Sequence, residues 1–270
     1  MIASLLQIQR HSPCRRLSRR AFTLVELLVA IAVLTLIMML FTQVLNSVSG
    51  AYSRGRNDAE SYSTGRALLD AVGRDLQCAF IREDLVSFPE AGNSRRLAFY
   101  TAQAGIAANP VAIRDLSFVE YYQSQEEDSA ALVRADADIE WSSVEKIAFG
   151  STAPPLLTPR TLSNGILAFD YRFITSDGVA ARKPAKPSSV IAVRISLAVT
   201  DPKTMQAIRR IDALSSLKTA LKTAVEEETL FSARSAWEAW INTAGYPGGV
   251  LGGIRFFERV VPLNPQANLE

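Results

Sequence analysis

Hydrophobic residues are concentrated in one continuous run near the N-terminus of the chain. Residues 21–41 read AFTLVELLVAIAVLTLIMMLF, and Thr23, Glu26 and Thr35 are the only polar residues in the run. About 20 apolar residues in a helix cross a hydrocarbon layer of roughly 30 Å. The pattern therefore predicts a membrane-spanning helix over residues 22–48.

Beyond this run the apolar residues return at helical spacing, and no proline occurs before Pro89. Two stripes follow steps of three, four or seven residues: Val44, Leu45, Val48 and Tyr52, then Tyr62, Leu69, Val72, Leu76 and Phe80. The sequence predicts one helix over 22–82, with 49–83 outside the membrane and the polar segment 53–61 as a pliable neck.

The remaining residues, 84–270, read as a globular domain that is mainly β. Period-two alternation, as in Leu167, Phe169, Tyr171 and Phe173, is typical of half-buried strands. The Asn164-Gly165 and Asp177-Gly178 pairs are turn signals. Strands are expected at 97–101, 116–123, 131–133, 144–149, 166–175, 190–200 and 254–262. The predicted fold class is α+β, a long helix packed on an antiparallel sheet.

The block from about 202 to 244 changes to helical periodicity. Residues 205–225 suit one helix and residues 230–241 suit a second. We expect a helical hairpin inserted before the last strand. The glycine-rich residues 245–253 match neither a dinucleotide-binding nor a P-loop motif, so they are interpreted as a flexible connection.

Charge separates the N-terminus from the rest of the 270-residue chain, whose net charge is +2. Residues 1–20 contain five arginines and no acid. The positive-inside rule places this segment in the cytoplasm and the body outside. Within 21–48 the only charge is Glu26, and a carboxylate in a bilayer costs about 2.5–3.5 kcal/mol on insertion scales. Glu26 therefore needs a partner or a function.

Two ordinary explanations of the N-terminus stay open at this point. A secretory signal peptide could be cleaved after the small residues 48–50, although its apolar region is typically only about 7–15 residues long. A plain single-pass anchor fits the length but gives Glu26 no role. Cleavage before Phe22 would instead create an α-amino group one helical turn before Glu26.

Residues 19–30, RRAFTLVELLVA, resemble the class III signal of type IV prepilins and type II secretion pseudopilins. The resemblance implies a basic leader, 1–21, cleaved between Ala21 and Phe22 by a prepilin peptidase that also N-methylates Phe22. Glu26 would guide assembly with other pseudopilins or pilins by neutralising a neighbour's amino terminus. The chain departs from the family at Ala21, where glycine is usual.

The body adds two shorter resemblances, and its large size predicts a role near a filament tip. Residues 66–77 and 96–100 resemble the J-type minor pseudopilin, and residues 118–123 and 255–263 resemble Verru_Chthon cassette protein C. Both imply a minor pseudopilin anchored in the inner membrane with a periplasmic body. Nucleic acid is not an expected partner, because the basic charge belongs to the N-terminus.

The sequence offers little catalytic chemistry, so the expected role is not enzymatic and no catalytic residue is predicted. The single histidine and one of the two cysteines lie in the first 14 residues, which leaves Cys78 alone in the body. Cys78 is interpreted as a small buried hydrophobic residue. Asp136, Asp138 and Glu140 alternate and are weak calcium candidates, although a solvated strand face explains them more simply. No other cofactor or metal is expected.

Overall fold

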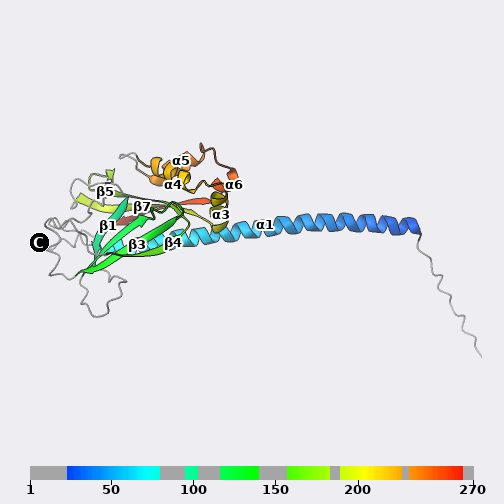
Figure 1. Ribbon diagram of the computed structural model, residues 1–270, viewed down its shortest axis with the longest axis horizontal. Helices are drawn as coiled ribbons and strands as arrows, with labels where there is room; N and C mark the ends of the chain where they lie inside the picture. The colour runs from blue at the N-terminus through cyan, green and yellow to red at the C-terminus, as the bar shows by residue number, and fades with distance from the viewer. Residues whose placement is uncertain are drawn as a thin grey trace, which may run out of the picture. The chain divides into compact units, whose positions relative to one another are not determined.

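The computed structural model describes residues 23–79, 95–102, 116–139, 157–182, 189–226 and 231–263 (Figure 1). It consists of a long first helix, two four-stranded sheets and a group of short helices. The elements are α1 (Leu24–Gln77), β1 (Arg96–Thr101), β2 (Leu116–Gln123), β3 (Ala131–Ile139), β4 (Thr158–Asn164), β5 (Ile166–Thr175), β6 (Ala180–Ala181), β7 (Val190–Thr200), α3 (Pro202–Arg210), α4 (Leu214–Thr223), α5 (Ala233–Ile241), α6 (Gly248–Leu251) and β8 (Ile254–Pro262).

The predicted long helix is confirmed, but it ends at Gln77, before the expected residue 82. Ala79 instead forms an antiparallel bridge to Thr101. The Cys78 carbonyl accepts hydrogen bonds from the Ala102 N–H at 3.0 Å and the Thr101 hydroxyl at 3.2 Å. Strand β1 and the residue after it thus bind the carbonyl group that a continuing helix would use itself.

The chain divides into two compact units, Met1–Ser53 and Arg54–Glu270. The boundary falls at the start of the polar segment interpreted as a neck. In the first unit the described residues form only the beginning of α1. The second unit holds the last part of α1, both sheets and all the short helices.

Both sheets are antiparallel; sheet A has the strand order β1-β2-β3-β4 and sheet B has the order β6-β5-β7-β8. The predicted bounds of β2, β5, β7 and β8 are confirmed. Strand β4 was not predicted, because its sequence TPRTLSN contains a proline and mostly polar residues. It lies at the edge of its sheet, where such residues are tolerated. The strand expected at 144–149 lies outside the described residues.

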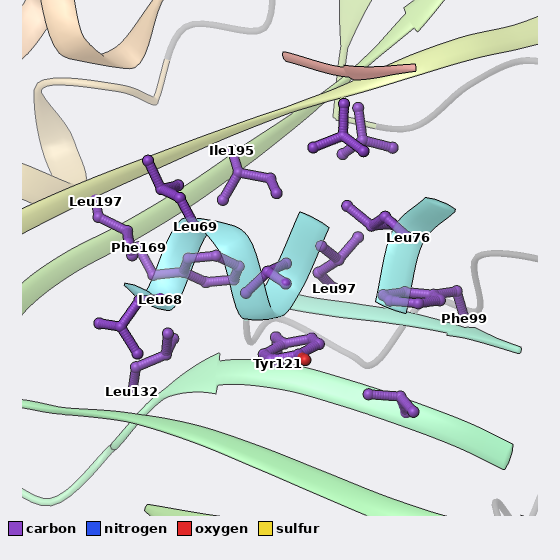
Figure 2. Close-up of a cluster of buried hydrophobic side chains, with 14 of the residues drawn as sticks. Leu68, Leu69, Leu76, Leu97, Phe99, Tyr121, Leu132, Phe169, Ile195 and Leu197 are labelled. Atoms are coloured by element: carbon purple, nitrogen blue, oxygen red, sulfur yellow. The ribbon is translucent and has the colours of Figure 1, made fainter. Parts of the chain in front are cut away.

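The second unit is organised around one face of α1. Leu68, Leu69, Val72 and Leu76 are at most 6% exposed and belong to a single hydrophobic cluster with residues of both sheets. Figure 2 shows the helix with Phe169, Ile195 and Leu197 of sheet B on one side and Tyr121 and Leu132 of sheet A on the other. The α+β fold with a long helix packed on antiparallel sheet is therefore confirmed.

A β-bulge corrects the predicted faces of β5. Leu167 was expected on the same face as Phe169, but it belongs to a second cluster beneath the short helices. The register with β7 shifts between Ile166 and Ala168. This shift lets Leu167 and Ala168 both face the helices, while Ile166 and Phe169 face α1.

The predicted helical hairpin is wrong in detail. The first of its two helices is broken into α3 and α4, because Asp212 adopts a left-handed backbone conformation with φ of 50°. Asp201 caps α3, accepting hydrogen bonds from the N–H groups of Lys203 and Thr204. The fully buried Trp237 of α5 donates its indole N–H to the Leu221 carbonyl at 2.9 Å, which joins α5 to α4.

The glycine-rich connection has a defined packing role. Residues 248–251 form the short helix α6, and Gly253 lies directly against α3. A Cβ atom at Gly253 would stand 1.8 Å from the Thr204 hydroxyl oxygen. The connection is therefore packed at this point rather than merely flexible.

Two glycines of α1 give opposite expectations for the same substitution. Gly65 packs against Phe257, whose ring atoms would lie 2.6 Å from an added Cβ, whereas nothing lies within 4 Å at Gly55. We expect Gly55→Ala to raise the free energy of unfolding by about 0.5–1 kcal/mol through helix propensity. Gly65→Ala should lower it, because overpacking costs about 1–3 kcal/mol and exceeds that gain.

Chemical unfolding of the two detergent-solubilised variants, followed by tryptophan fluorescence, checks this pair. Equal changes in the free energy of unfolding for Gly55→Ala and Gly65→Ala would contradict the close packing of α1 on β8.

Candidate functional site

The site that the sequence singled out lies at the start of α1, where Thr23 and Glu26 form a reciprocal pair. The Thr23 N–H donates to Glu26 Oε2 at 3.0 Å, and the Glu26 N–H donates to Thr23 Oγ1 at 3.2 Å. The Thr23 hydroxyl also donates to Glu26 Oε2 at 3.2 Å. This is a capping box, which satisfies backbone N–H groups that a helix start leaves unpaired.

Glu26 is evident in the sequence as a lone charge, whereas Thr23 is interpreted there only as a polar interruption of the apolar run. The signal for Thr23 was present, since a threonine followed three residues later by glutamate is the capping-box pattern. Glu26 Oε1 has no hydrogen-bond partner among the residues that the structure describes. One carboxylate oxygen therefore fixes the side chain at the helix start, and the other faces outward.

An apolar surface surrounds the outward-facing carboxylate. Along one face of α1, Glu26 is followed by Val29, Ala30, Val33, Leu34 and Ile37. Every large hydrophobic side chain between Leu24 and Val48 is 49–79% exposed. Such a continuous apolar surface requires lipid or other protein chains to cover it.

Two threonine hydroxyl groups of this segment are satisfied within the helix. The Thr35 hydroxyl donates to the Ala32 carbonyl and the Thr42 hydroxyl donates to the Met38 carbonyl, each at 2.8 Å. Such bonds make a hydroxyl tolerable in an apolar environment. By length and composition α1 can cross a membrane, and Glu26 is the one ionisable group between Thr23 and Gly50.

Ala21 and Phe22, the residues predicted to flank the cleavage site, lie outside the described residues. Their processing stays a prediction. Glu26 is described, and it lies in the first turn of α1, where the helix dipole favours a negative charge.

Comparison with known proteins agrees with the motif. Residues 16–42 match the model of the prokaryotic N-terminal methylation motif. The chain is also similar to the pilin-like protein PilA3 of Thermus thermophilus. The two are 26% identical over 169 residues, which cover 59% of this chain and 69% of that protein.

Two solved structures also resemble the chain. The first belongs to the GspK-GspI-GspJ complex of the enterotoxigenic Escherichia coli type 2 secretion system. It is 16% identical with a TM-score of 0.33, and the match covers 53% of this chain and 90% of that one. The second is the type IV-like pilin TTHA1219 from Thermus thermophilus, which is 15% identical with a TM-score of 0.36. That match covers 76% of this chain and 96% of that one.

The chain carries a prepilin-type N-terminal methylation motif and is similar to a pilin-like protein. Its first helix carries that motif, and a separate α+β unit follows.

The weak calcium candidates are not brought together among the described residues. Asp136 was expected on a solvated strand face, but it is 1% exposed and its carboxylate lies 3.2 Å from the Arg134 guanidinium. The expectation was wrong because this face of β3 turns toward α1. No group of three metal-ligating side chains occurs within the described part of the chain, and neither the Asp138 side chain nor Glu140 belongs to that part. Calcium binding stays untested.

Arg134 and Asp136 belong to a buried polar cluster that joins α1 to sheet A. Asp75 Oδ2 accepts hydrogen bonds from the Tyr121 hydroxyl at 2.5 Å and from Arg134 Nε at 2.9 Å. Although burial lowers the pKa of Arg134, the Asp75 carboxylate raises it above its usual range. Burial and then Asp75 raise the pKa of Tyr121. The cluster therefore contains charged Arg134 and a neutral tyrosine.

Cys78 is exposed, which corrects its interpretation as a buried residue. The helix ends one residue earlier, so Cys78 no longer follows the apolar stripe of α1. Its backbone carbonyl, rather than its thiol, makes the contact with sheet A.

The buried cluster gives a sharp prediction because α1 carries a matched exposed aspartate. Asp75→Asn should lower the free energy of unfolding by about 1–3 kcal/mol, since it removes the charged acceptor of Arg134 Nε and of the Tyr121 hydroxyl, while Asp136 still pairs with Arg134. Asp70 pairs with Arg259 at the surface, with its side chain 63% exposed. Asp70→Asn should therefore cost less than about 1 kcal/mol.

Urea titration of both variants measures the difference. An equal decrease in the free energy of unfolding in both variants would show that the buried ion pair between α1 and sheet A stabilises the protein no more than a surface pair does.

Proposed function

We propose that this protein is a minor pseudopilin, a subunit processed by a prepilin peptidase and assembled into a type II secretion pseudopilus or a type IV pilus-like filament. Cleavage between Ala21 and Phe22 removes the basic leader, and Phe22 is N-methylated. The role is structural rather than enzymatic. Its partners are the peptidase, the inner membrane and other pseudopilins or pilins.

One observation carries this proposal: the Glu26 carboxylate projects from a helix segment whose other exposed side chains are almost all apolar. A plain anchor gains nothing from this charge, because a carboxylate in the bilayer costs about 2.5–3.5 kcal/mol. The cost is offset when a cation of a neighbouring subunit pairs with it. The matched methylation motif supports a cleavage site before Phe22, four residues ahead of Glu26.

The capping box supports this pairing geometrically. Thr23 holds Glu26 Oε2, so the carboxylate stays at the helix start instead of turning along the helix. Glu26 Oε1 is then available to the α-amino group of Phe22 in an adjacent subunit. Packing of the surrounding apolar side chains excludes water and strengthens the ion pair.

The arginines before the apolar run support a cytoplasmic N-terminus and a periplasmic body. The second unit, Arg54–Glu270, is bulky and carries a helical group between β7 and β8. Bulky bodies pack poorly along a shaft, which favours a position at or near the filament tip.

Replacement of Glu26 tests the proposal. In cells that contain the peptidase and partner subunits, Glu26→Leu should reach the membrane normally but enter sheared filaments on the order of a hundredfold less. The reason is that a neighbour's ammonium group would be buried without a partner. Immunoblots of the filament and membrane fractions measure both quantities.

Thr35→Leu is the matched control, because it places the same residue in the same helix without removing a charge. This variant should assemble at the normal level. Normal assembly of Glu26→Leu would favour a single-pass anchor that does not polymerise.

A further inference from the structure

A small basic pocket lies in the second unit, between α4 and strands β2 and β5. Its volume is about 200 Å³, enough for a small polar group, and Phe169 and Ala168 of β5 form part of its wall. We call it the α4 pocket. No residue of α1 lines it, so it is separate from the helix surface proposed for assembly.

The charged residues that line the α4 pocket are unbalanced. Arg95, Lys218 and Lys222 face it with Glu127 as the one acidic residue. On α4, Ser215, Lys218, Thr219 and Lys222 are spaced by three or four residues and so share one face of the helix. Two ammonium groups and two hydroxyl groups are thereby presented along the same wall.

Lys218 is held by neutral oxygens rather than by a carboxylate. Its ammonium group donates to the carbonyls of Ser124, Glu126 and Ser129 at 3.2, 2.9 and 2.8 Å. Burial lowers the pKa of Lys218, although Glu126 and Glu127 act in the opposite direction. These carbonyls fix the position of the ammonium group without neutralising it.

Arg95 adds a second charge that is compensated only in part. It donates to the Lys222 carbonyl at 2.7 Å, and its Nη1 lies 3.8 Å from Asp170. Asp170 also forms ion pairs with Arg172 at 3.2 Å and with Arg182 at 3.0 Å. Burial and then Arg182 lower the pKa of Arg95 to about 10, although Asp170 and Glu226 raise it. One buried carboxylate shared by three guanidinium groups leaves positive charge beside the pocket.

The Lys222 ammonium completes the site, since it makes no hydrogen bond or ion pair with any described residue. We propose that the α4 pocket binds a carboxylate group, which accepts hydrogen bonds from the Lys222 ammonium and the Arg95 guanidinium. The planar guanidinium matches a carboxylate, and Glu127 disfavours more highly charged anions. An acidic side chain of another protein and a small organic acid share this chemistry.

Titration of the full-length protein in detergent with paired probes tests this site. Glutarate represents the small acids, acetyl-Gly-Glu-Gly-amide represents an acidic protein segment, and glutaramide and acetyl-Gly-Gln-Gly-amide are their neutral counterparts. We expect a carboxylate probe to bind with a Kd on the order of 1 mM, as observed through the amide NMR signals of α4, and its neutral counterpart not to bind.

Lys222→Gln should weaken that binding roughly tenfold by removing a charge-assisted hydrogen bond. Lys203→Gln is the control, because Lys203 is an exposed lysine on α3 outside the α4 pocket. Binding of the peptide alone assigns the source to a protein, and binding of glutarate alone assigns it to a small acid. Either result supports the site.

Three results would overturn the proposal. The first is equal binding of the charged and neutral probes. The second is no binding of either acid at about twenty times the expected Kd of roughly 1 mM. The third is an equal loss of affinity for the carboxylate probe in the Lys222→Gln and Lys203→Gln variants. None of these results depends on filament assembly, so failure here leaves the proposed pseudopilin function intact.

Discussion

The structure depends on burying one stripe of α1 between two sheets. Leu68, Leu69, Val72 and Leu76 contribute to a single core with β1–β3 on one side and β5, β7 and β8 on the other. Packing of this stripe against both sheets, rather than helix propensity alone, stabilises this part of the helix. Asp75 lies beside this stripe, and its bonds to Tyr121 and Arg134 add a polar connection to sheet A. The close approach of Phe257 to Gly65 shows that β8 packs against the same helix.

The first part of α1 is not buried by the sheets. Its large apolar side chains are exposed on every face of the helix. The hydrophobic effect drives such a surface into lipid or against similar helices. In that environment the polar groups must be paired, as Thr35 and Thr42 are within the helix. Glu26 is only partly satisfied by Thr23, and this incomplete pairing is the physical basis of the proposed subunit contact.

Sequence periodicity predicted the fold well where one pattern dominated. The bounds of β2, β5, β7 and β8 followed from their apolar runs and turn residues, and the long helix followed from the absence of proline.

Tertiary contacts determined the features that periodicity did not predict. Edge strand β4 carries no strand pattern, a bulge turns Leu167 to the other face, and the left-handed Asp212 divides a predicted helix. Asp136 looked solvated because it alternates with apolar residues as Asp138 and Glu140 do. Its pairing with Arg134 and the packing of α1 bury it instead. At the site, Glu26 was evident as a lone charge, and its spacing from Thr23 already indicated a capping box. The different surroundings of the two Glu26 carboxylate oxygens required the geometry of the helix start.

In the proposed function the chain enters a filament pathway through its N-terminus. The intact mass and N-terminal residue of the membrane-extracted protein, produced with and without a prepilin peptidase, test this step. A filament subunit should start at N-methylated Phe22 only when the peptidase is present. An intact Met1 under both conditions, or a start near Ala51 from ordinary signal cleavage, would contradict it.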